Sequence, residues 1–170
     1  MPASLNELNT ADEAAFLATL GHLFEHSPWV VKETWPRRPF RDLDRLHAKL
    51  CATMRGAPQE KQLALIRAHP DLAGRLAQQR QLTAESSREQ ACTGLDRLSN
   101  DALAEFTRLN EAYQARFGFP CVICARLNAS DAILAAMRAR IDHSPDDEFA
   151  AALGEIEKIA RLRLIDAVRH

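Results

Sequence analysis

Apolar residues recur at helical spacing along most of the chain. One such line consists of Leu43, Leu46, Leu50 and Met54, because residues three or four positions apart share one face of a helix. Asp42 precedes the line and Gly56 ends it, as capping residues commonly do. The pattern therefore predicts a helix between these two residues.

Similar patterns predict further helices over residues 10–27, 58–68, 71–81, 83–91, 99–117, 131–141 and from 145 almost to the end. Thr10 and Glu13 have the spacing of a capping box at the start of the first of these. Residues 28–40 are interpreted as a loop, and residues 117–123 as an extended segment because Gly118 and Pro120 break the helical period. We expect an all-α protein, a single compact bundle of about eight helices that forms one domain over residues 1–170.

Composition narrows the class of protein. The chain has 170 residues, of which 46% are apolar and 26% charged, as in globular proteins of one domain. The net charge of −1 argues against binding to nucleic acid. No uncharged apolar run reaches the roughly 18 residues of a membrane span, and no basic residue precedes an apolar block in residues 1–16. We therefore expect a cytoplasmic protein without membrane contact.

Cysteine and histidine patterns suggest neither a metal nor a disulfide framework. Cys121 and Cys124 form a CxxC motif, which suits a redox pair or half a zinc site, but no second such pair follows. We interpret them as reduced, partly buried thiols. His22 and His26 lie four residues apart and could bind a metal from one helix face, yet no third ligand is evident.

The last predicted helix has one arginine in its apolar face. At about 100° per residue, Arg163 falls in the middle of the stripe that contains Leu153, Ile156 and Ile159. A buried guanidinium needs an anion opposite it, which is either a structural carboxylate or a carboxylate of a ligand. Arg163→Met distinguishes the two interpretations: a structural ion pair predicts a large drop in melting temperature, and ligand binding predicts weaker binding with little loss of stability.

A histidine lies on the buried side of an earlier predicted helix. His69 follows Leu65 by four residues and Ile66 by three, so the three share one face. It also precedes Pro70, where the helix must end. The imidazole is therefore either a core residue with its hydrogen bonds satisfied or an inward-facing acid/base group.

The helix over residues 83–91 is less distinctive. Ala84, Ala91 and Leu95 are interpreted as its apolar side, with Glu89 on the flank. Ser86 and Gln90 lie four residues apart and so offer two hydrogen-bonding groups on neighbouring turns.

Four stretches together resemble the signatures of one enzyme family. They are Phe24-Glu25-His26-Ser27-Pro28-Trp29-Val30, Ala68-His69-Pro70-Asp71-Leu72-Ala73-Gly74, Glu85-Ser86-Ser87-Arg88-Glu89-Gln90 with Gly94-Leu95, and Arg116-Phe117-Gly118-Phe119-Pro120. In this order, across residues 5–168, they resemble 2-oxo-4-hydroxy-4-carboxy-5-ureidoimidazoline (OHCU) decarboxylase, the last enzyme on the route from uric acid to (S)-allantoin.

The resemblance implies an all-helical carboxy-lyase that needs no cofactor or metal, acts on the small molecule OHCU and commonly forms a homodimer. By position, His69 would be the catalytic acid/base and Glu89 its carboxylate partner. The implied substrate contacts are Pro70, Ser86, Gln90, Arg163 and, largely through the backbone, Cys121, Val122, Ile123, Cys124 and Ala125. Cys121 departs from the family, which usually has an aromatic residue there.

Two other functions are compatible with the same residues. One is a helical binding module that keeps the scaffold without turnover, and the other is a lyase or hydrolase acting on a neighbouring ureide. Release of CO2 from OHCU separates the decarboxylase from both.

Overall fold

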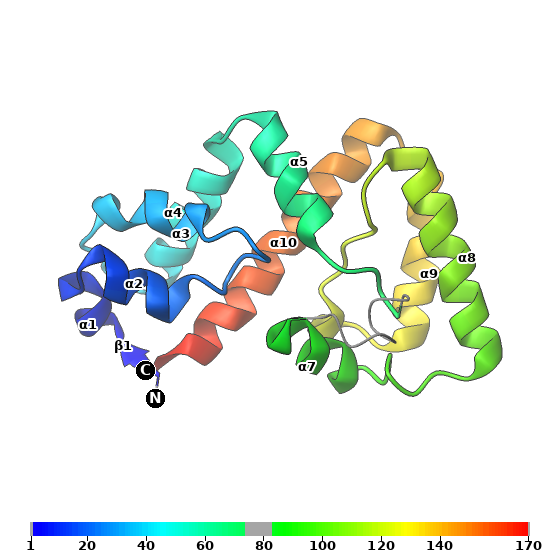
Figure 1. The fold of residues 1–170 in the computed structure, drawn as a ribbon, viewed down its shortest axis with the longest axis horizontal. Helices are drawn as coiled ribbons and strands as arrows, with labels where there is room; N and C mark the ends of the chain where they lie inside the picture. Colours follow the sequence, from blue (N-terminus) through cyan, green and yellow to red (C-terminus); the bar gives the residue numbers. More distant parts are fainter. Residues whose placement is uncertain (1, 74–82, 170) are drawn as a thin grey trace. The chain divides into compact units, whose positions relative to one another are not determined.

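The computed structural model describes residues 2–73 and 83–169, which are predominantly helical (Figure 1). An all-α fold is thus confirmed. The helix expected over residues 71–81 falls mostly outside the described residues. The chain divides into two compact units, which we call unit 1 (Met1–Ala68 and Ile156–His170) and unit 2 (His69–Glu155). That both belong to one domain stays a prediction.

Unit 1 combines the N-terminal helices with the C-terminal end of the chain. Its helical elements are α1 (Leu5–Thr10), α2 (Glu13–Leu20), α3 (Trp29–Thr34), the 3-10 turn η1 (Trp35–Arg37), α4 (Leu43–Gly56), α5 (Gln59–Ala68) and the second half of α10 (Pro145–Ala167). Two short strands, β1 (Ala3–Ser4) and β2 (Val168–Arg169), pair in parallel and join the two ends. This small sheet was not predicted.

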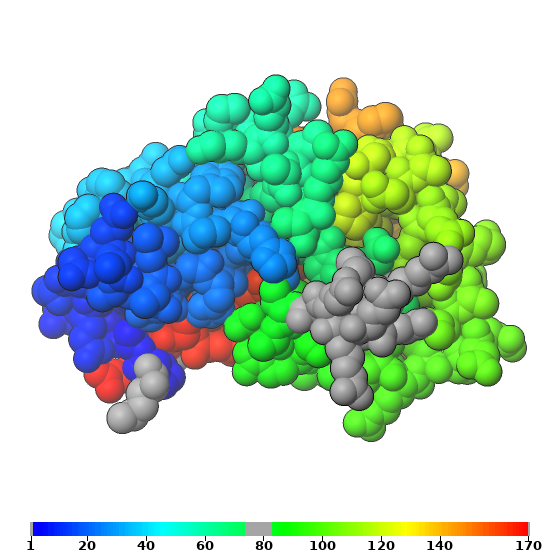
Figure 2. Space-filling view, viewed as in Figure 1, coloured from blue at the N-terminus to red at the C-terminus, as the bar shows by residue number. Residues whose placement is uncertain are grey.

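The α4 helix is confirmed as predicted. Asp42 Oδ1 accepts a hydrogen bond from the Arg45 amide at 2.8 Å, and Leu46, Leu50 and Met54 are fully buried. In Figure 2 the N-terminal helices (blue) cover much of the C-terminal end of α10 (red). The core of unit 1 therefore joins residues from both ends of the sequence.

The N-terminal part of unit 1 differs from the prediction. A continuous helix over residues 10–27 is wrong, because Thr10 is the last residue of α1 and α2 ends at Leu20. The capping box is formed by Ser4 and Glu7 instead, and Asp12 caps α2. The expected loop over residues 28–40 also contains the short helices α3 and η1.

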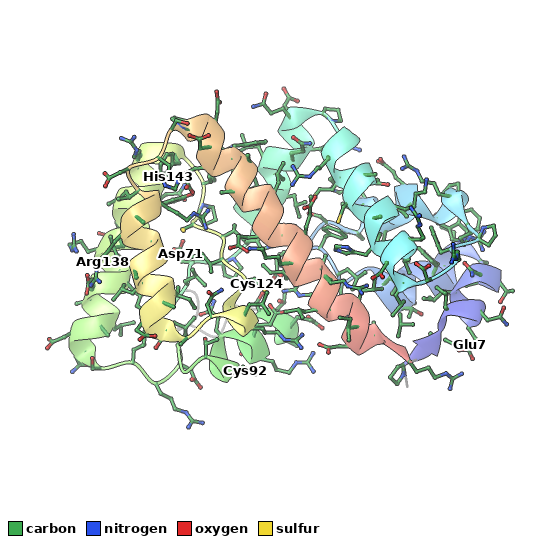
Figure 3. The ribbon with its side chains drawn as sticks, turned by 180° about the vertical axis from the view of Figure 1, so that it is seen from behind. Glu7, Asp71, Cys92, Cys124, Arg138 and His143 are labelled. Atoms are coloured by element: carbon green, nitrogen blue, oxygen red, sulfur yellow. The ribbon has the colours of Figure 1, made fainter. Side chains whose placement is uncertain are left out.

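Unit 2 contains α7 (Ala84–Cys92), α8 (Asn100–Phe117), the turn η2 (Ala125–Leu127), α9 (Ser130–Arg140) and the first half of α10. Ser99 caps α8, as predicted, and Gly118 ends it with a positive φ of 75° that favours glycine. Helices α8 and α9 lie side by side (Figure 1), where Arg138 pairs with Glu105 (Figure 3). The extended segment predicted over residues 117–123 begins too early, because Phe117 is the last residue of α8 and residues 118–119 form a bend. Residues 120–124 belong to neither a helix nor a strand.

Within residues 2–73 and 83–169, none of the helices is both long and apolar enough to cross a membrane.

Candidate active site

His69 lies immediately after α5, at the point where Pro70 ends the helix. His69 is only 7% exposed, and the two residues that share its face of α5, Leu65 and Ile66, are fully buried. The inward orientation expected from the helix period is therefore confirmed. An imidazole held away from bulk water at a helix end is suited to transfer a proton to a bound ligand.

The segment that follows His69 is held by two buried amide side chains. Gln90 Nε2 donates to the Asp71 carbonyl at 3.2 Å, and Gln90 Oε1 accepts from the Ala73 amide at 3.1 Å. Asn110 Nδ2 donates to the Leu72 carbonyl at 2.8 Å. Ala73 has a φ of 52°, a left-handed conformation that is unfavourable for alanine. We call residues 70–73 the His69-adjacent segment.

The inner face of α7 is polar, in contrast to the prediction. Ala84 and Ala91 are exposed, whereas Ser86 and Gln90 are buried at 5% and 6% exposure. The assignment of the two alanines to the buried side is wrong because the hydrogen bonds of Gln90 turn the polar face inward. Glu89 is half-buried on the flank of this helix, as expected.

The segment from Cys121 to Ala125 is buried throughout and leads into η2, which packs against α7. Arg140 Nη1 donates to the Val122 carbonyl at 2.7 Å, and Asn128 Nδ2 donates to the Cys124 carbonyl at 2.9 Å. Side chains at the ends of η2 and α9, Asn128 and Arg140, thus fix the backbone of this segment. The segment from Cys121 to Ala125 and helix α7 therefore lie close together in unit 2.

Arg140, which bonds to the Val122 carbonyl, also belongs to a buried ionic network around Glu148. Glu148 is fully buried and accepts hydrogen bonds from Arg140 Nε at 2.9 Å and from the Tyr113 hydroxyl. His143 Nδ1 lies 2.9 Å from the same carboxylate, close to the start of α10 (Figure 3). Burial, followed by the hydrogen bond to Glu148, raises the pKa of Tyr113 above its ordinary value, so this phenol stays protonated.

The two cysteines of the CxxC motif form no disulfide and are fully rather than partly buried, each at 1% exposure. That they are reduced stays an interpretation. Burial raises the pKa of Cys121 to about 12, so the nucleophilic thiolate is scarce near neutral pH. In the part of the chain that the structure describes, no three His, Cys, Asp or Glu side chains group as metal ligands.

Arg163 belongs to unit 1 and has a buried carboxylate partner there. Its Nη2 donates to Glu25 Oε2 at 2.9 Å, and its Nη1 donates to the His22 carbonyl at 3.2 Å. The side chains of Arg163 and Glu25 are 3% and 2% exposed. The expected anion is thus found within the protein, in one of the stretches that carry the family resemblance.

Comparison with known proteins decides the family. A model of the OHCU decarboxylase family matches residues 9–165. The chain belongs to the OHCU decarboxylase family. It is 43% identical over 163 residues to the 2-oxo-4-hydroxy-4-carboxy-5-ureidoimidazoline decarboxylase of Haloferax volcanii. The match covers 96% of this chain and 95% of that protein.

Two further matches span only part of their counterparts. The uric acid degradation bifunctional protein PucL of Bacillus subtilis is 38% identical over 97% of this chain, but the match covers 33% of PucL. A crystal structure of (S)-allantoin synthase superposes with a TM-score of 0.76 and 27% identity over 98% of this chain. The chain spans about half of that solved chain, 54% of its length.

The OHCU decarboxylase resemblance therefore rests on the whole fold as well as on the motifs. All site residues that the resemblance predicts lie in unit 2, except for Arg163, which lies in unit 1. Spacing along the sequence pointed to His69 and Arg163, but it missed Glu25, Asn110 and Glu148. Asn110 had one available signal, since it is an amide within the apolar stripe of its helix.

Asp71, in the His69-adjacent segment, gives a pH-dependent prediction. Burial raises its pKa, so the folded protein holds this proton more tightly than the unfolded chain, whose Asp pKa is about 3.9. The favourable contribution of protonated Asp71 is complete below that value and is lost as pH rises through the higher folded pKa. Asp71→Asn should therefore become more stable relative to the parent protein as pH rises from acid to neutral.

Urea unfolding of both proteins across this pH range checks the expectation. Asp166→Asn, which changes an exposed carboxylate in α10, provides the control. A stability difference for Asp71→Asn that stays constant with pH would contradict the effect of burial.

Proposed function

We propose that this chain decarboxylates OHCU to (S)-allantoin and CO2, the last step of the degradation of urate to allantoin. The supporting observation is the polar inner face of α7, where Ser86 and Gln90 are buried and Gln90 holds the backbone next to His69. A buried face of this kind stabilises the fold less than an apolar one, and it offers oriented hydrogen-bonding groups for a polar ligand.

The substrate itself takes up the electrons that the reaction releases. Its carboxylate is attached to a ring carbon that also bears a hydroxyl and adjoins an imine. When the bond to CO2 breaks, its electron pair moves into the ring and the imine nitrogen gains a proton. The hydroxyl then loses its proton as the ring carbonyl forms, and a proton adds to the neighbouring carbon. One proton is taken up overall, and the protein must supply orientation and proton transfer.

His69 is the proposed acid/base group in this sequence of proton transfers. Its buried position restricts the imidazole to one side of a bound ligand, and delivery of the proton from one face would give a single enantiomer. Glu89, half-buried on α7, is the proposed carboxylate partner that orients the imidazole and stabilises its protonated form.

The remaining predicted residues are proposed to contact substrate. Ser86 and Gln90 would bind its ureido and oxo groups, since each amide atom of Gln90 can form one further hydrogen bond beyond that to the backbone. Pro70 and the backbone from Cys121 to Ala125 would line the site. Cys121, in place of the usual aromatic residue, would change packing against the ring and leave the proton transfers intact.

Arg163 is the proposed group for an anionic oxygen of the substrate. Glu25 already neutralises much of its charge, so Arg163 would bind such an oxygen less tightly than an isolated guanidinium. Moderate binding suits a decarboxylase, because strong binding of the leaving carboxylate would stabilise the ground state and slow its loss.

We also propose a cytoplasmic homodimer as the working form of the enzyme. The family resemblance supports the dimer. None of the cysteines at residues 51, 92, 121 and 124 forms a disulfide, which supports a reducing compartment. Sedimentation equilibrium of the purified protein would distinguish a dimer from a monomer.

The decisive experiment generates OHCU in place from urate with urate oxidase and hydroxyisourate hydrolase, and then adds this protein. Circular dichroism would follow optically active (S)-allantoin against the slow background reaction. We expect rapid formation of one enantiomer. If the folded protein does not accelerate the reaction, the proposal is wrong, and binding of OHCU or turnover of another ureide becomes the function to examine.

A further inference from the structure

Asn110 is a buried amide in an otherwise apolar part of α8. Its neighbours on the inner face, Phe106 and Tyr113, are each 1% exposed, and Asn110 itself is 6% exposed. Polar side chains are rarely buried unless their hydrogen bonds are satisfied. The position of Asn110 therefore calls for an explanation other than packing.

The hydrogen bonds of Asn110 are only half satisfied. Its Nδ2 donates to the Leu72 carbonyl at 2.8 Å, but its Oδ1 is buried and has no hydrogen-bond partner among residues 2–73 and 83–169. A buried acceptor without a partner is at least as unfavourable as one hydrogen bond is favourable. Within the described part of the chain, the amide thus contributes little net stability, and its effect is to fix the position of one carbonyl.

That carbonyl lies three residues after His69, and few backbone torsions separate the two. Pro70 has its own φ fixed by its ring and restricts the backbone of His69 to extended conformations. Gln90 holds Asp71 and Ala73 on either side of Leu72. A carbonyl fixed at residue 72 therefore limits where the imidazole of His69 can lie.

We propose that Asn110 is a positioning residue that holds His69 in place through the Leu72 carbonyl. Asn110 does not itself need to touch the substrate. Helix α8 provides a rigid support for it, because Ser99 caps the helix and Gly118 ends it. The inference rests on the proposed acid/base role of His69 and adds a residue from a helix that the proposed mechanism does not otherwise use.

The first test is Asn110→Leu, which retains a side chain of similar size and removes the donor. We expect kcat for OHCU to fall by about 10- to 100-fold, because small misplacements of a reacting group have effects of this order. KM should change less than about threefold, since the proposed substrate contacts are retained. Near-normal kcat, or a higher KM with unchanged kcat, would overturn the proposal.

Gln62→Leu is the matched control. Gln62 is also a buried amide, 8% exposed, and its Nε2 donates to the carbonyls of Met54 and Arg55 at 3.1 and 2.8 Å. Gln62 lies in α5, and the two carbonyls that it bonds are in α4 rather than in the His69-adjacent segment. We expect its kcat to be unchanged even if its stability falls. A fall in kcat as large as that of Asn110→Leu would overturn the proposal.

Asn110→Asp adds a readout that a purely structural role would not affect. An ionised carboxylate cannot donate to the Leu72 carbonyl, but a protonated one can, and burial raises the pKa of a carboxyl group. The ratio of its kcat to that of the parent protein, per folded molecule, should therefore rise as pH falls from 8 to 5.5. A ratio independent of pH would count against the proposal.

Amide hydrogen exchange separates failure of this inference from failure of the proposed function. If the parent protein turns over OHCU, the kinetic comparison decides the role of Asn110. If it does not, exchange at Asp71, Leu72 and Ala73 still reports whether Asn110 holds the segment. Faster exchange there in Asn110→Leu but not in Gln62→Leu would support the positioning role, and unchanged exchange would overturn it.

Discussion

Replacement of His69 by alanine is expected to lower kcat for OHCU by about 100-fold or more, with the helical circular dichroism spectrum retained. Loss of a general acid/base commonly has an effect of this size. The fold should survive because His69 follows the end of α5 and lies outside its apolar core residues, Leu65 and Ile66. The coupled assay from urate, followed by circular dichroism, measures the change.

His22→Ala is the control for this variant. His22 is exposed, and only its backbone carbonyl bonds to Arg163, which the substitution leaves in place. We expect it to turn over OHCU at the parent rate. Near-normal turnover in His69→Ala would remove this histidine from the mechanism, and an equal loss in both variants would point to an effect on folding.

Removal of either member of the Arg163–Glu25 pair is expected to lower the free energy of unfolding by about 3–5 kcal/mol, as for buried ion pairs in general. Both side chains are almost completely buried, so Glu25→Leu leaves a guanidinium without its carboxylate, and Arg163→Met leaves the carboxylate without its guanidinium. For a protein of this size, the melting temperature should fall by roughly 6–20 °C. Urea and thermal unfolding would measure both effects.

The double variant, Glu25→Leu with Arg163→Met, is the sharper comparison. Because it removes both charges, it should be more stable than either single variant. Single losses below about 1 kcal/mol, or losses that simply add, would contradict a tightly coupled pair. A large fall in melting temperature for Arg163→Met identifies the structural ion pair, and the kinetics of the double variant show whether the guanidinium also assists turnover.

Long helices with clear end signals could be predicted from the sequence. Asp42 and Ser99 cap α4 and α8 as expected, and α10 begins at Pro145. In each case a capping residue or a proline adjoins an apolar stripe of several turns, so local propensity and packing agree. Such agreement makes the helix insensitive to its tertiary surroundings.

Short elements could not be predicted because their stability comes from distant parts of the chain. Helix α3 has only six residues and follows a proline, so no periodic stripe marks it. The pairing of Ala3 with Val168 joins residues at opposite ends of the sequence. The start of α1 was missed because two capping-box patterns lie close together, and Ser4 rather than Thr10 forms the box.

The residues of the candidate site also differ in whether a local pattern or a distant contact determines their position. His69 and Arg163 could be found because each is a polar residue on an apolar face of a helix. Ala84 and Ala91 were wrongly assigned to the buried side of α7, because that side is set by the hydrogen bonds of Gln90 to residues 71 and 73. Glu148 also escaped notice, since Asp146 and Asp147 beside it are exposed and its partners Arg140 and Tyr113 come from other helices.

The discontinuity of unit 1 has a consequence for the order in which the protein can fold as it is synthesised. All residues of unit 2, His69–Glu155, are made before the last residues of unit 1, Ile156–His170. During synthesis on the ribosome, Glu25 therefore lacks its ion-pair partner until Arg163 has been translated. The first part of unit 1, Met1–Ala68, is thus synthesised before unit 2, although unit 1 is completed only after it. Until then, the apolar residues of that first part lack the helix that covers them.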